Sequence, residues 1–511
     1  MSEASFIYEL PLETAPSDER VLGIRFEAGR ALLNACLGEG LRRLDLMRER
    51  TLWLRAREST NKKERKELFS MLQKQFALTD YGLQAFAIKT KNACYIGDHL
   101  DTHTTQKIAT RAYKAIAEHM FGRRGRPRFK NKQRFRSLEG KNNAAGIRFK
   151  DGKICWSGLE LKPLYDHKDK HGVEAHALNC KTKYVRLVKK EIRERTFYYA
   201  QLIQEGLPQQ KAKNSHGDDI VGLDIGPSTI AMVSSTQASL VPFCASLELM
   251  HKPIACIQKY LARSRRFTNK DNYHVDGTIK RGPKKWHSSK RYLRARSRLS
   301  ELQRRMAETR KKLHGEMCNN ILNIGTKIKT EKLSYVSFQK QWGKSVGARA
   351  PGMFVLKLRS KAARAGGGLM EFSPRLTKLS QECHGCDTLR KKKLSERIHH
   401  CTCGVGPVQR DLYTGFLARF VSSNILNKRQ AQKAWPDAEP LLQGALLSLN
   451  ETASGKLRFA SFGLSQIQRQ SGLHLKDGSV PSEAAEVVWM GKPIPESGGE
   501  LGSIAVRTPG L

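Results

Sequence analysis

Four cysteines in one short, basic segment constrain the fold more than any other feature of this sequence. The segment reads C-x-x-C, a loop rich in Lys and Arg, and then C-x-C-G; its cysteines are Cys383, Cys386, Cys401 and Cys403. This spacing is close to that of the paired knuckles that hold one Zn²⁺ ion in a tetrahedral site. Zinc binding can replace a hydrophobic core in so short a segment. We expect a structural zinc site, because four thiolate ligands leave no coordination position open for chemistry.

Two other interpretations of this segment remain open from the spacing alone. The cysteines could form a redox pair, or a nearby histidine could replace one cysteine as a ligand; the candidates are His384, His399 and His400. The remaining cysteines are scattered singly among apolar or mixed neighbours, which does not suggest a disulfide framework. We expect small core residues at Cys36, Cys94, Cys155, Cys180, Cys244, Cys256 and Cys318.

The charge of the chain indicates a polyanionic partner. Its 511 residues include 91 Lys and Arg against 48 Asp and Glu, a formal net charge of +43 at pH 7. Such a surface binds nucleic acid or an acidic membrane. No apolar run approaches the roughly 20 residues of a spanning helix, and the N-terminal residues lack the basic start and apolar segment of a signal peptide. We therefore expect a cytosolic protein that binds nucleic acid.

The positive charge is unevenly distributed along the chain. Residues 252–312 contain 20 Lys and Arg against 4 Asp and Glu, and part of this segment has helical spacing. A charge run is usually a solvated helix face, but an imbalance of this size favours contact with phosphate. Residues 430–511 contain 7 Lys and Arg against 8 Asp and Glu, and residues 492–511 have a composition typical of disorder.

Apolar periodicity divides the rest of the chain. Apolar residues recur at helical spacing within residues 17–119, most clearly over 31–47 and 105–121. A basic stretch punctuated by Gly and Pro follows at 122–137, and residues 146–162 and 184–203 then alternate like strands joined by turns. These patterns predict a helical module, a small β-domain, a polar linker at 208–219 and a third region from residue 220.

Three acidic residues stand where apolar elements begin or end. Asp224 lies inside the apolar strand VGLDIGPSTIAMVSS, Glu331 follows ILNIGTKIKT, and Asp411 opens the helical pattern DLYTGFLARFVSSNIL. Each acid alone has an ordinary explanation, such as a helix cap or a surface residue at a strand end. Together they would form an oxygen-rich pocket for two divalent ions, Mg²⁺ or Mn²⁺, that act on a phosphodiester. This interpretation predicts that Asp224 faces metal, because a buried carboxylate needs a cation or hydrogen bonds.

These motifs, in this order, resemble the three RuvC motifs and the inserted zinc ribbon of the transposon-encoded TnpB nucleases and their relatives, the compact type V CRISPR effectors. The matching stretches are VGLDIGPSTIA, IKTEKL and LSQECHGC…CTCGVGPVQRDLYTGFLA. Upstream, GRRGRPRFKNKQRFRS and the strands after it resemble the wedge domain of the family. The match covers roughly residues 17–427, and the C-terminal tail has no counterpart that we recognise.

The resemblance implies a multidomain α+β fold, with an RNase H-like (RuvC) α/β nuclease domain that carries a Cys₄ zinc ribbon, and a β-barrel wedge domain with a helical recognition insertion. The expected parts are a first wedge strand (1–16), the recognition module (17–121), the wedge β-domain (122–207), a linker (208–219), the nuclease domain with basic helices (220–380), the zinc ribbon (381–408), the end of the nuclease domain (409–429) and a C-terminal extension (430–511).

Carried over position by position, the resemblance implies that Asp224, Glu331 and Asp411 bind Mg²⁺ or Mn²⁺ and that the four cysteines bind Zn²⁺. The sequence departs from the family around these acids: Lys332 replaces an acid, Gln409 replaces the first Asp of Asp-Arg-Asp, and Tyr-Thr-Gly at 413–415 replaces Asn-Ala-Ala. Such neighbours tune ligand orientation. The expected nucleic-acid contacts are Arg123, Arg124, Arg126, Arg128, Lys130, Arg291, Arg294 and Arg298.

The implied function is an RNA-guided DNA endonuclease that cleaves its target by two-metal hydrolysis. A guide RNA would supply sequence specificity, and the protein would read a short motif that flanks the double-stranded DNA target. The expected location is the prokaryotic cytoplasm, on nucleoid DNA, with no membrane partner. The alternative is an RNA-guided DNA-binding protein that acts by occlusion with weak or no cleavage; the altered neighbours favour it and the intact acids oppose it. Whether the protein is a monomer or a dimer stays open.

Overall fold

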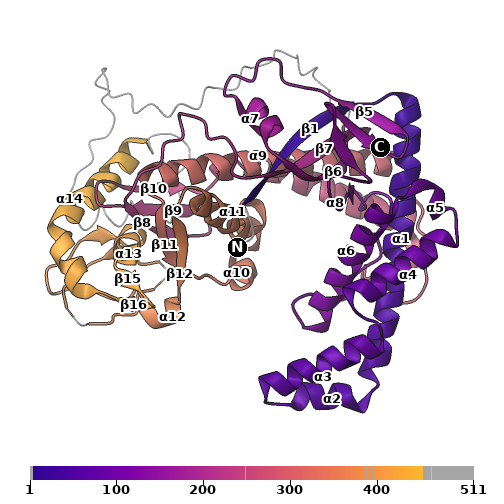
Figure 1. Cartoon of the computed structure of the whole chain (residues 1–511). Helices are drawn as coiled ribbons and strands as arrows, with labels where there is room; N and C mark the ends of the chain where they lie inside the picture. The colour runs from indigo at the N-terminus through magenta and orange to yellow at the C-terminus, as the bar shows by residue number, and fades with distance from the viewer. Residues whose placement is uncertain (1–3, 248, 387, 394, 453–461, 463–511) are drawn as a thin grey trace, which may run out of the picture. The chain divides into compact units, whose positions relative to one another are not determined.

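The computed structural model describes residues 4–247, 249–386, 388–393, 395–452 and 462. Two large β-sheets organise these residues, and Figure 1 shows the helices that accompany each sheet. Among the described residues, no helix combines the length and the apolar content that a membrane crossing needs. The disorder expected for residues 492–511 lies outside the described residues.

The first sheet has, within the described chain, seven antiparallel strands in the order β2-β6-β7-β1-β5-β4-β3. The β6–β7 hairpin turns at Arg193 and Glu194, whose φ angles of 49° and 67° suit the turn type that matches the right-handed twist of paired strands. The strands, with the short helix that separates β5 from β6, are β1 (Ser5–Glu13), β2 (Ser137–Glu139), β3 (Arg148–Lys150), β4 (Lys153–Trp156), β5 (Leu159–Pro163), α7 (Val173–Asn179), β6 (Thr182–Ile192) and β7 (Arg195–Glu205).

A run of helices separates β1 from β2 in the sequence. Phe26 of the first helix packs against Phe135 and Tyr198, so the helices and the sheet share one hydrophobic core. The last helix starts where Asp101 caps it, by accepting a hydrogen bond of 2.9 Å from the backbone N–H of Thr104. The helices are α1 (Pro16–Arg48), α2 (Thr51–Glu58), α3 (Lys62–Gln75), α4 (Asp80–Asn92), α5 (Ile96–His99) and α6 (Thr102–Met120).

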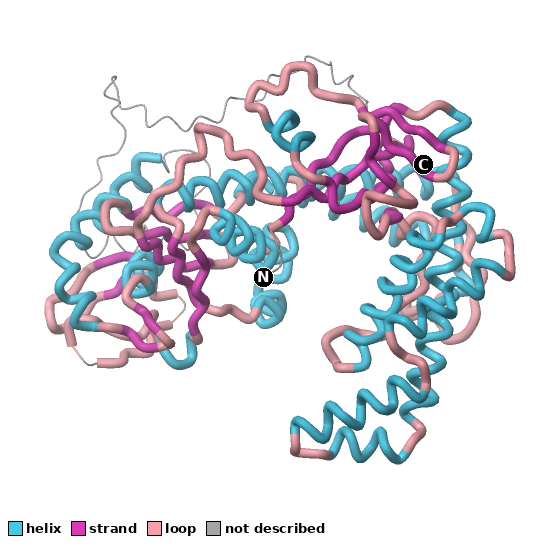
Figure 2. Tube along the Cα trace, in the orientation of Figure 1, coloured by secondary structure: helices cyan, strands magenta, loops and turns pink. Residues whose placement is uncertain are grey.

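The second sheet has five strands in the order β10-β9-β8-β11-β12. β9 is antiparallel to both β8 and β10, whereas β8, β11 and β12 are mutually parallel. In Figure 2 these strands form one magenta sheet with cyan helices beside it. The elements are β8 (Ile220–Ile225), β9 (Thr229–Val233), β10 (Ala238–Pro242), α8 (His251–Thr268), α9 (Lys290–Ile324), β11 (Lys327–Glu331), α10 (Tyr335–Arg349), α11 (Pro351–Arg364) and β12 (Gly368–Phe372).

The cysteine segment follows β12 and contains little regular structure. The helical pattern predicted for residues 411–426 ends earlier than expected, because the chain leaves the helix after Ala418 and forms a tight hairpin. Residues from 428 onward form a helix that packs against β10. These elements are α12 (Pro374–Thr377), β13 (Ile398–His399), β14 (Val408–Gln409), α13 (Arg410–Ala418), β15 (Val421–Ser422), β16 (Ile425–Leu426) and α14 (Lys428–Thr452).

The scattered cysteines only partly follow the expectation of small core residues. Cys36, Cys244 and Cys318 are buried. Cys94 and Cys256 are exposed, so the expectation is wrong for them: one follows the end of α4 and the other lies on the outer face of α8. The other two, Cys155 and Cys180, are partly buried.

Candidate metal centres and basic pocket

Asp224 lies near the end of β8, between two core residues. Leu223 and Ile225 are buried, while the Asp224 side chain keeps partial solvent access. Burial raises the pKa of Asp224 well above its ordinary value, and the carboxylates of Asp411 and Glu331 raise it further. Two of the acids that the sequence analysis selected, Asp411 and Glu331, therefore lie close enough to the third, Asp224, to repel its negative charge.

Glu331 reaches this place through parallel strand pairing. It is the last residue of β11, which pairs with β8 in a register that sets Thr330 opposite Leu223. Continuing this register by one residue places Glu331 beside Asp224, at the carboxyl ends of both strands. Burial raises the pKa of Glu331 to about 7.

Asp411 approaches the other two acids on the first turn of α13. Gln409 caps this helix, because its side-chain oxygen accepts a hydrogen bond of 2.8 Å from the backbone N–H of Leu412. The helix packs closely on β8 because two glycines meet there: a Cβ on Gly222 would lie 1.9 Å from the carbonyl oxygen of Gly415. The missing side chain of Gly222 thus permits the close contact between β8 and the helix that carries Asp411.

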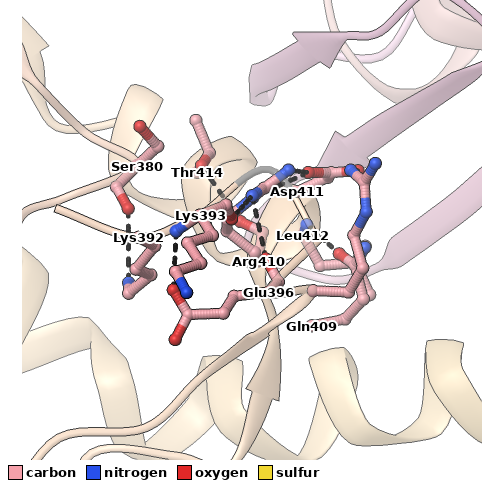
Figure 3. A network of polar contacts seen from close by, with 10 residues as sticks. Ser380, Lys392, Lys393, Glu396, Gln409, Arg410, Asp411, Leu412 and Thr414 are labelled. Atoms are coloured by element: carbon pink, nitrogen blue, oxygen red, sulfur yellow. Dashed lines mark hydrogen bonds and ion pairs between the residues drawn. The ribbon is translucent and has the colours of Figure 1, made fainter. Parts of the chain in front are cut away.

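Two arginines accompany Asp411. A guanidinium nitrogen of Arg397 lies 3.8 Å from one carboxylate oxygen of Asp411, and one of Arg410 lies 3.4 Å from the other. Arg410 also donates a hydrogen bond of 2.8 Å to the backbone carbonyl of Glu396, so it links the cysteine segment to the acid (Figure 3). Both arginines lower the pKa of Asp224, but burial and the neighbouring acids outweigh them.

The chemistry of the three acids fits a hard divalent cation. Carboxylate oxygens are the ligands that Mg²⁺ and Mn²⁺ prefer. Burial raises the pKa values of both Asp224 and Glu331, although both arginines lower that of Asp224. A bound divalent ion would favour the ionised carboxylates. The side chain of Lys332, which follows Glu331, is exposed.

The four cysteines selected from the sequence form one cluster. The sulfur atoms of all four lie within 4.8 Å of one another. Sγ of Cys383 lies 3.6 Å from that of Cys403, and Sγ of Cys386 lies 3.4 Å from that of Cys401. The backbone N–H of Cys403 lowers the pKa of the Cys401 thiol to about 6, which favours the thiolate form that binds metal. This arrangement can hold a zinc ion.

The nearby histidines do not belong to the cluster. Among the described residues, the group that could hold a metal ion contains the four cysteines and no histidine. His384 and His399 are both buried, and both contact Tyr413 of α13 instead. His400 is exposed. The alternative in which a histidine replaces a cysteine therefore has no support in the geometry.

A basic pocket of about 980 Å³ lies beside α1 and α6. The segment 124–136 forms one of its walls and is tied to α1 by Asn34, whose side chain accepts a hydrogen bond of 2.8 Å from the backbone N–H of Lys130 and donates one of 2.9 Å to its carbonyl. Burial and the neighbouring Arg111 lower the pKa of Lys130. Arg123 is exposed and does not line the pocket. The predicted contacts that do line it are Arg124, Arg126, Arg128 and Lys130.

The sequence interpretation missed a second basic wall of this pocket. Lys107, Arg111 and Lys114 of α6 line it, and their spacing places them on one helix face. That spacing was present in the helical pattern of residues 105–121 and could have identified them. Glu118 and Glu139 are the acids in the lining. The surplus of cations suits a phosphate backbone.

The remaining predicted contacts lie on α9. Arg291, Arg294 and Arg298 are all exposed, and their spacing places them on one face of the helix. In the described part of the chain, no ion pair with an acid is found for these three side chains. They form a second, separate basic surface.

Comparisons with known proteins find only weak structural similarity. No family model and no curated protein matches the sequence. A cryo-EM structure of a Cas12f1–sgRNA–target DNA complex is similar at 12% identity with a TM-score of 0.41, over 81% of this chain and 98% of that chain. A cryo-EM structure of a CRISPR–Cas12f ternary complex is similar at 13% identity with a TM-score of 0.28, over 78% of this chain and 81% of that one. Likenesses this weak do not assign a function.

Proposed function

We propose that this chain is an RNA-guided DNA endonuclease of the TnpB and compact type V effector class, with a nuclease centre formed by Asp224, Glu331 and Asp411. The observation that carries the proposal is the convergence of these acids from β8, β11 and α13. A structural role gives no reason to gather three carboxylates in one partly buried site, because their repulsion opposes folding. A group of carboxyl groups with strongly raised pKa values is typical of a catalytic site.

The arrangement of the second sheet supports an RNase H-like nuclease domain. Within this sheet, β9 runs opposite to the other strands in the order β10-β9-β8-β11-β12, and the neighbouring parallel strands β8 and β11 carry Asp224 and Glu331. The first sheet, with helices inserted between β1 and β2, fits a wedge domain with a recognition module. We assign the parts by the residue bounds that the sequence predicts.

The proposed chemistry divides the work between metal ions and side chains. Asp224, Glu331 and Asp411 would hold Mg²⁺ or Mn²⁺, which stabilise the charge that develops on a scissile phosphate. The guanidinium of Arg410 pairs with the carboxylate of Asp411. The position of this guanidinium is fixed by its hydrogen bond to a backbone carbonyl of the cysteine segment. The four cysteines would hold a structural Zn²⁺.

The basic surfaces support a guide RNA and a DNA target as partners. The pocket beside α6 and the arginines of α9 offer cations without a balancing number of acids. Such surfaces bind the phosphate backbone and do not read sequence. Sequence specificity would therefore come from base pairing with the guide, and the protein would read a short flanking motif.

A second function, RNA-guided DNA binding without cleavage, is favoured by one observation. Arg397 and Arg410 both pair with Asp411, so one metal-binding carboxylate already has cationic partners. If these pairs persist when DNA binds, the protein would occlude its target without cutting it.

The test uses the full chain, stripped of bound RNA and then supplied with cognate or scrambled guide. The substrate is a plasmid that carries the target beside a randomised flank, in Mg²⁺ or Mn²⁺. The proposal expects products only with the cognate guide and only with certain flanks. Equal cutting with scrambled RNA would identify an ordinary basic nuclease. Tight binding with the cognate guide but no product over a long incubation in Mn²⁺ would favour the second function.

A further inference from the structure

Tyr413 connects the cysteine segment to the helix that carries Asp411. It is fully buried at 0% exposure and lies two residues after Asp411 on α13. Its hydroxyl accepts a hydrogen bond of 3.0 Å from the backbone N–H of His384 and lies 2.8 Å from Nδ1 of the same residue. His384 stands between Cys383 and Cys386, so this bond fixes the first pair of cysteines to α13.

The ring of Tyr413 contacts the other half of the cysteine segment as well. His399 stacks on it, with ring centroids 4.1 Å apart and an interplanar angle of 22°. His399 belongs to β13 and precedes Cys401 by two residues. One side chain of α13 therefore holds both arms of the cysteine cluster.

The same segment holds the start of α13 through its backbone. The N–H of Arg410 donates a hydrogen bond of 2.8 Å to the carbonyl of Arg397, and the guanidinium of Arg410 donates one of 2.8 Å to the carbonyl of Glu396. β13 pairs with β14, which leads directly into the helix. The position of Asp411 thus depends on residues whose own fold depends on the cysteine cluster.

We propose that Tyr413 is a positioning residue that couples the four-cysteine zinc site to Asp411, so that loss of zinc loosens the first turns of α13. This inference rests on the proposed function only in treating Asp411 as a ligand of the catalytic metal. Where the family usually has asparagine, the tyrosine of this chain reaches both arms of the cluster. Neighbours that orient metal ligands typically change metal affinity by about 10 to 100-fold when lost.

The experiment compares three variants of the full chain, purified with zinc bound. Tyr413→Phe removes only the hydroxyl. Gln432→Leu removes a hydrogen bond of 2.7 Å that α14 makes to the carbonyl of His384 and leaves every side chain of α13 unchanged. Tyr165→Phe removes a hydroxyl that bonds the carbonyl of Gly152, far from both clusters in sequence, and is the matched control. The readouts are the rate of zinc transfer to a chromogenic chelator, amide hydrogen exchange of residues 410–418, and Mn²⁺ affinity by electron paramagnetic resonance.

We expect Tyr413→Phe to speed zinc transfer and weaken Mn²⁺ binding, each by about tenfold, and to increase exchange in residues 410–418. Gln432→Leu should change only zinc transfer, and Tyr165→Phe should change none of the three. Unchanged exchange and Mn²⁺ affinity in Tyr413→Phe would overturn the coupling, even if its melting temperature falls. If Tyr413→Phe does not fold, removal of zinc from the parent chain decides the question: exchange must rise in 410–418 and not in 195–205.

The readouts separate this inference from the proposed function. If the parent chain binds no Mn²⁺, the proposed nuclease centre fails, yet hydrogen exchange still tests the connection between zinc and α13. If Mn²⁺ binds and cleavage occurs but zinc removal leaves residues 410–418 protected, only the coupling is wrong.

Discussion

The cysteine segment contacts α13, the helix that carries Asp411, yet the chain builds the cysteine cluster and the group of three acids in opposite ways. The four cysteines come from one segment, residues 383–403, whose described part contains a single strand, the two-residue β13. The three acids come from β8, β11 and α13; the buried residues of the two strands belong to one hydrophobic core that includes Val221, Leu223 and Ile328, and α13 packs on β8. We expect the segment to need a metal ion in order to fold, because it contains little regular structure, whereas the sheet positions Asp224 and Glu331 by strand pairing.

This difference predicts opposite responses to substitution. A ligand lost from the cysteine cluster should cost local stability, because zinc binding there is folding free energy. Replacing an acid of the carboxylate cluster should reduce the rate of cleavage without lowering the free energy of unfolding. The reason is that Asp411 and Glu331 repel the charge of Asp224 in the folded state. The following experiments test that contrast.

The largest expected effect is the loss of cleavage in Asp224→Asn. Removing one ligand of a metal site that supplies several kcal/mol of transition-state stabilisation should slow cutting by at least about 10³-fold. The melting temperature should stay level or rise, because one of three repelling charges disappears. Plasmid cleavage with cognate guide, gel-shift binding and thermal unfolding measure these quantities. Asp151→Asn, at an exposed turn with a positive φ angle that asparagine tolerates, is the control. A variant that cuts at the parental rate removes Asp224 from the nuclease centre.

Cys386→Ser should have the next largest effect. The purified parent should carry about one zinc per chain, and the variant should carry almost none and melt several degrees lower, with the loss confined to the cysteine segment and α13. Elemental analysis and thermal unfolding check this result. Cys94→Ser changes an exposed cysteine outside the cluster and should alter neither quantity. Active parental protein without zinc would contradict the assignment.

The basic pocket should respond more moderately. Replacing Lys107, Arg111 and Lys114 together by glutamine should weaken RNA binding and reduce the slope of log affinity against log salt by about 2, at about 0.7 per single-stranded phosphate contact. The matched control replaces Lys62, Lys63 and Lys66 of α3, which are exposed and outside the pocket, with the same change in net charge. Equal losses in both triple variants would mean that net charge, and not the pocket, binds the RNA.

The smallest expected effect concerns the pH dependence of the core that supports the acids. Burial lowers the pKa of His314, whose Nε2 lies 2.8 Å from the carbonyl oxygen of Arg349 and whose ring packs against Phe243 and Phe354. The unfolded chain therefore takes up this proton first, so stability is complete above about pH 6.5 and falls as the pH decreases below it.

His314→Gln should flatten this dependence, since glutamine keeps a donor for the carbonyl of Arg349 and does not titrate. Chemical unfolding between pH 7.5 and pH 5.5 measures the difference between the two chains. An equal fall in stability in the variant would assign the acid sensitivity to other groups.

Local patterns in the sequence predicted much of the architecture. The helical spacing of residues 105–121 corresponds to α6, and the alternation over 184–203 corresponds to the β6–β7 hairpin. The prediction of a helix over residues 411–426 was wrong in its second half. Apolar residues continue at helical spacing past Ala418, but the chain leaves the helix there and forms a hairpin. The spacing of Lys107, Arg111 and Lys114 along the sequence indicates a basic face on α6. Only the folded structure shows that this face and segment 124–136 line the same pocket.

The sequence by itself determined the cysteine cluster, because its ligands are close along the chain and their chemistry admits few arrangements. It also determined which acids were candidates, since an acid inside an apolar strand requires compensation. Only the tertiary structure decided that Glu331 and Asp411 come near Asp224, because their approach depends on parallel pairing of β8 with β11 and on the contact between Gly222 and Gly415. It also decided the contacts of Tyr413, because spacing along the chain does not reveal that its hydroxyl will meet His384, which lies between two of the cysteines.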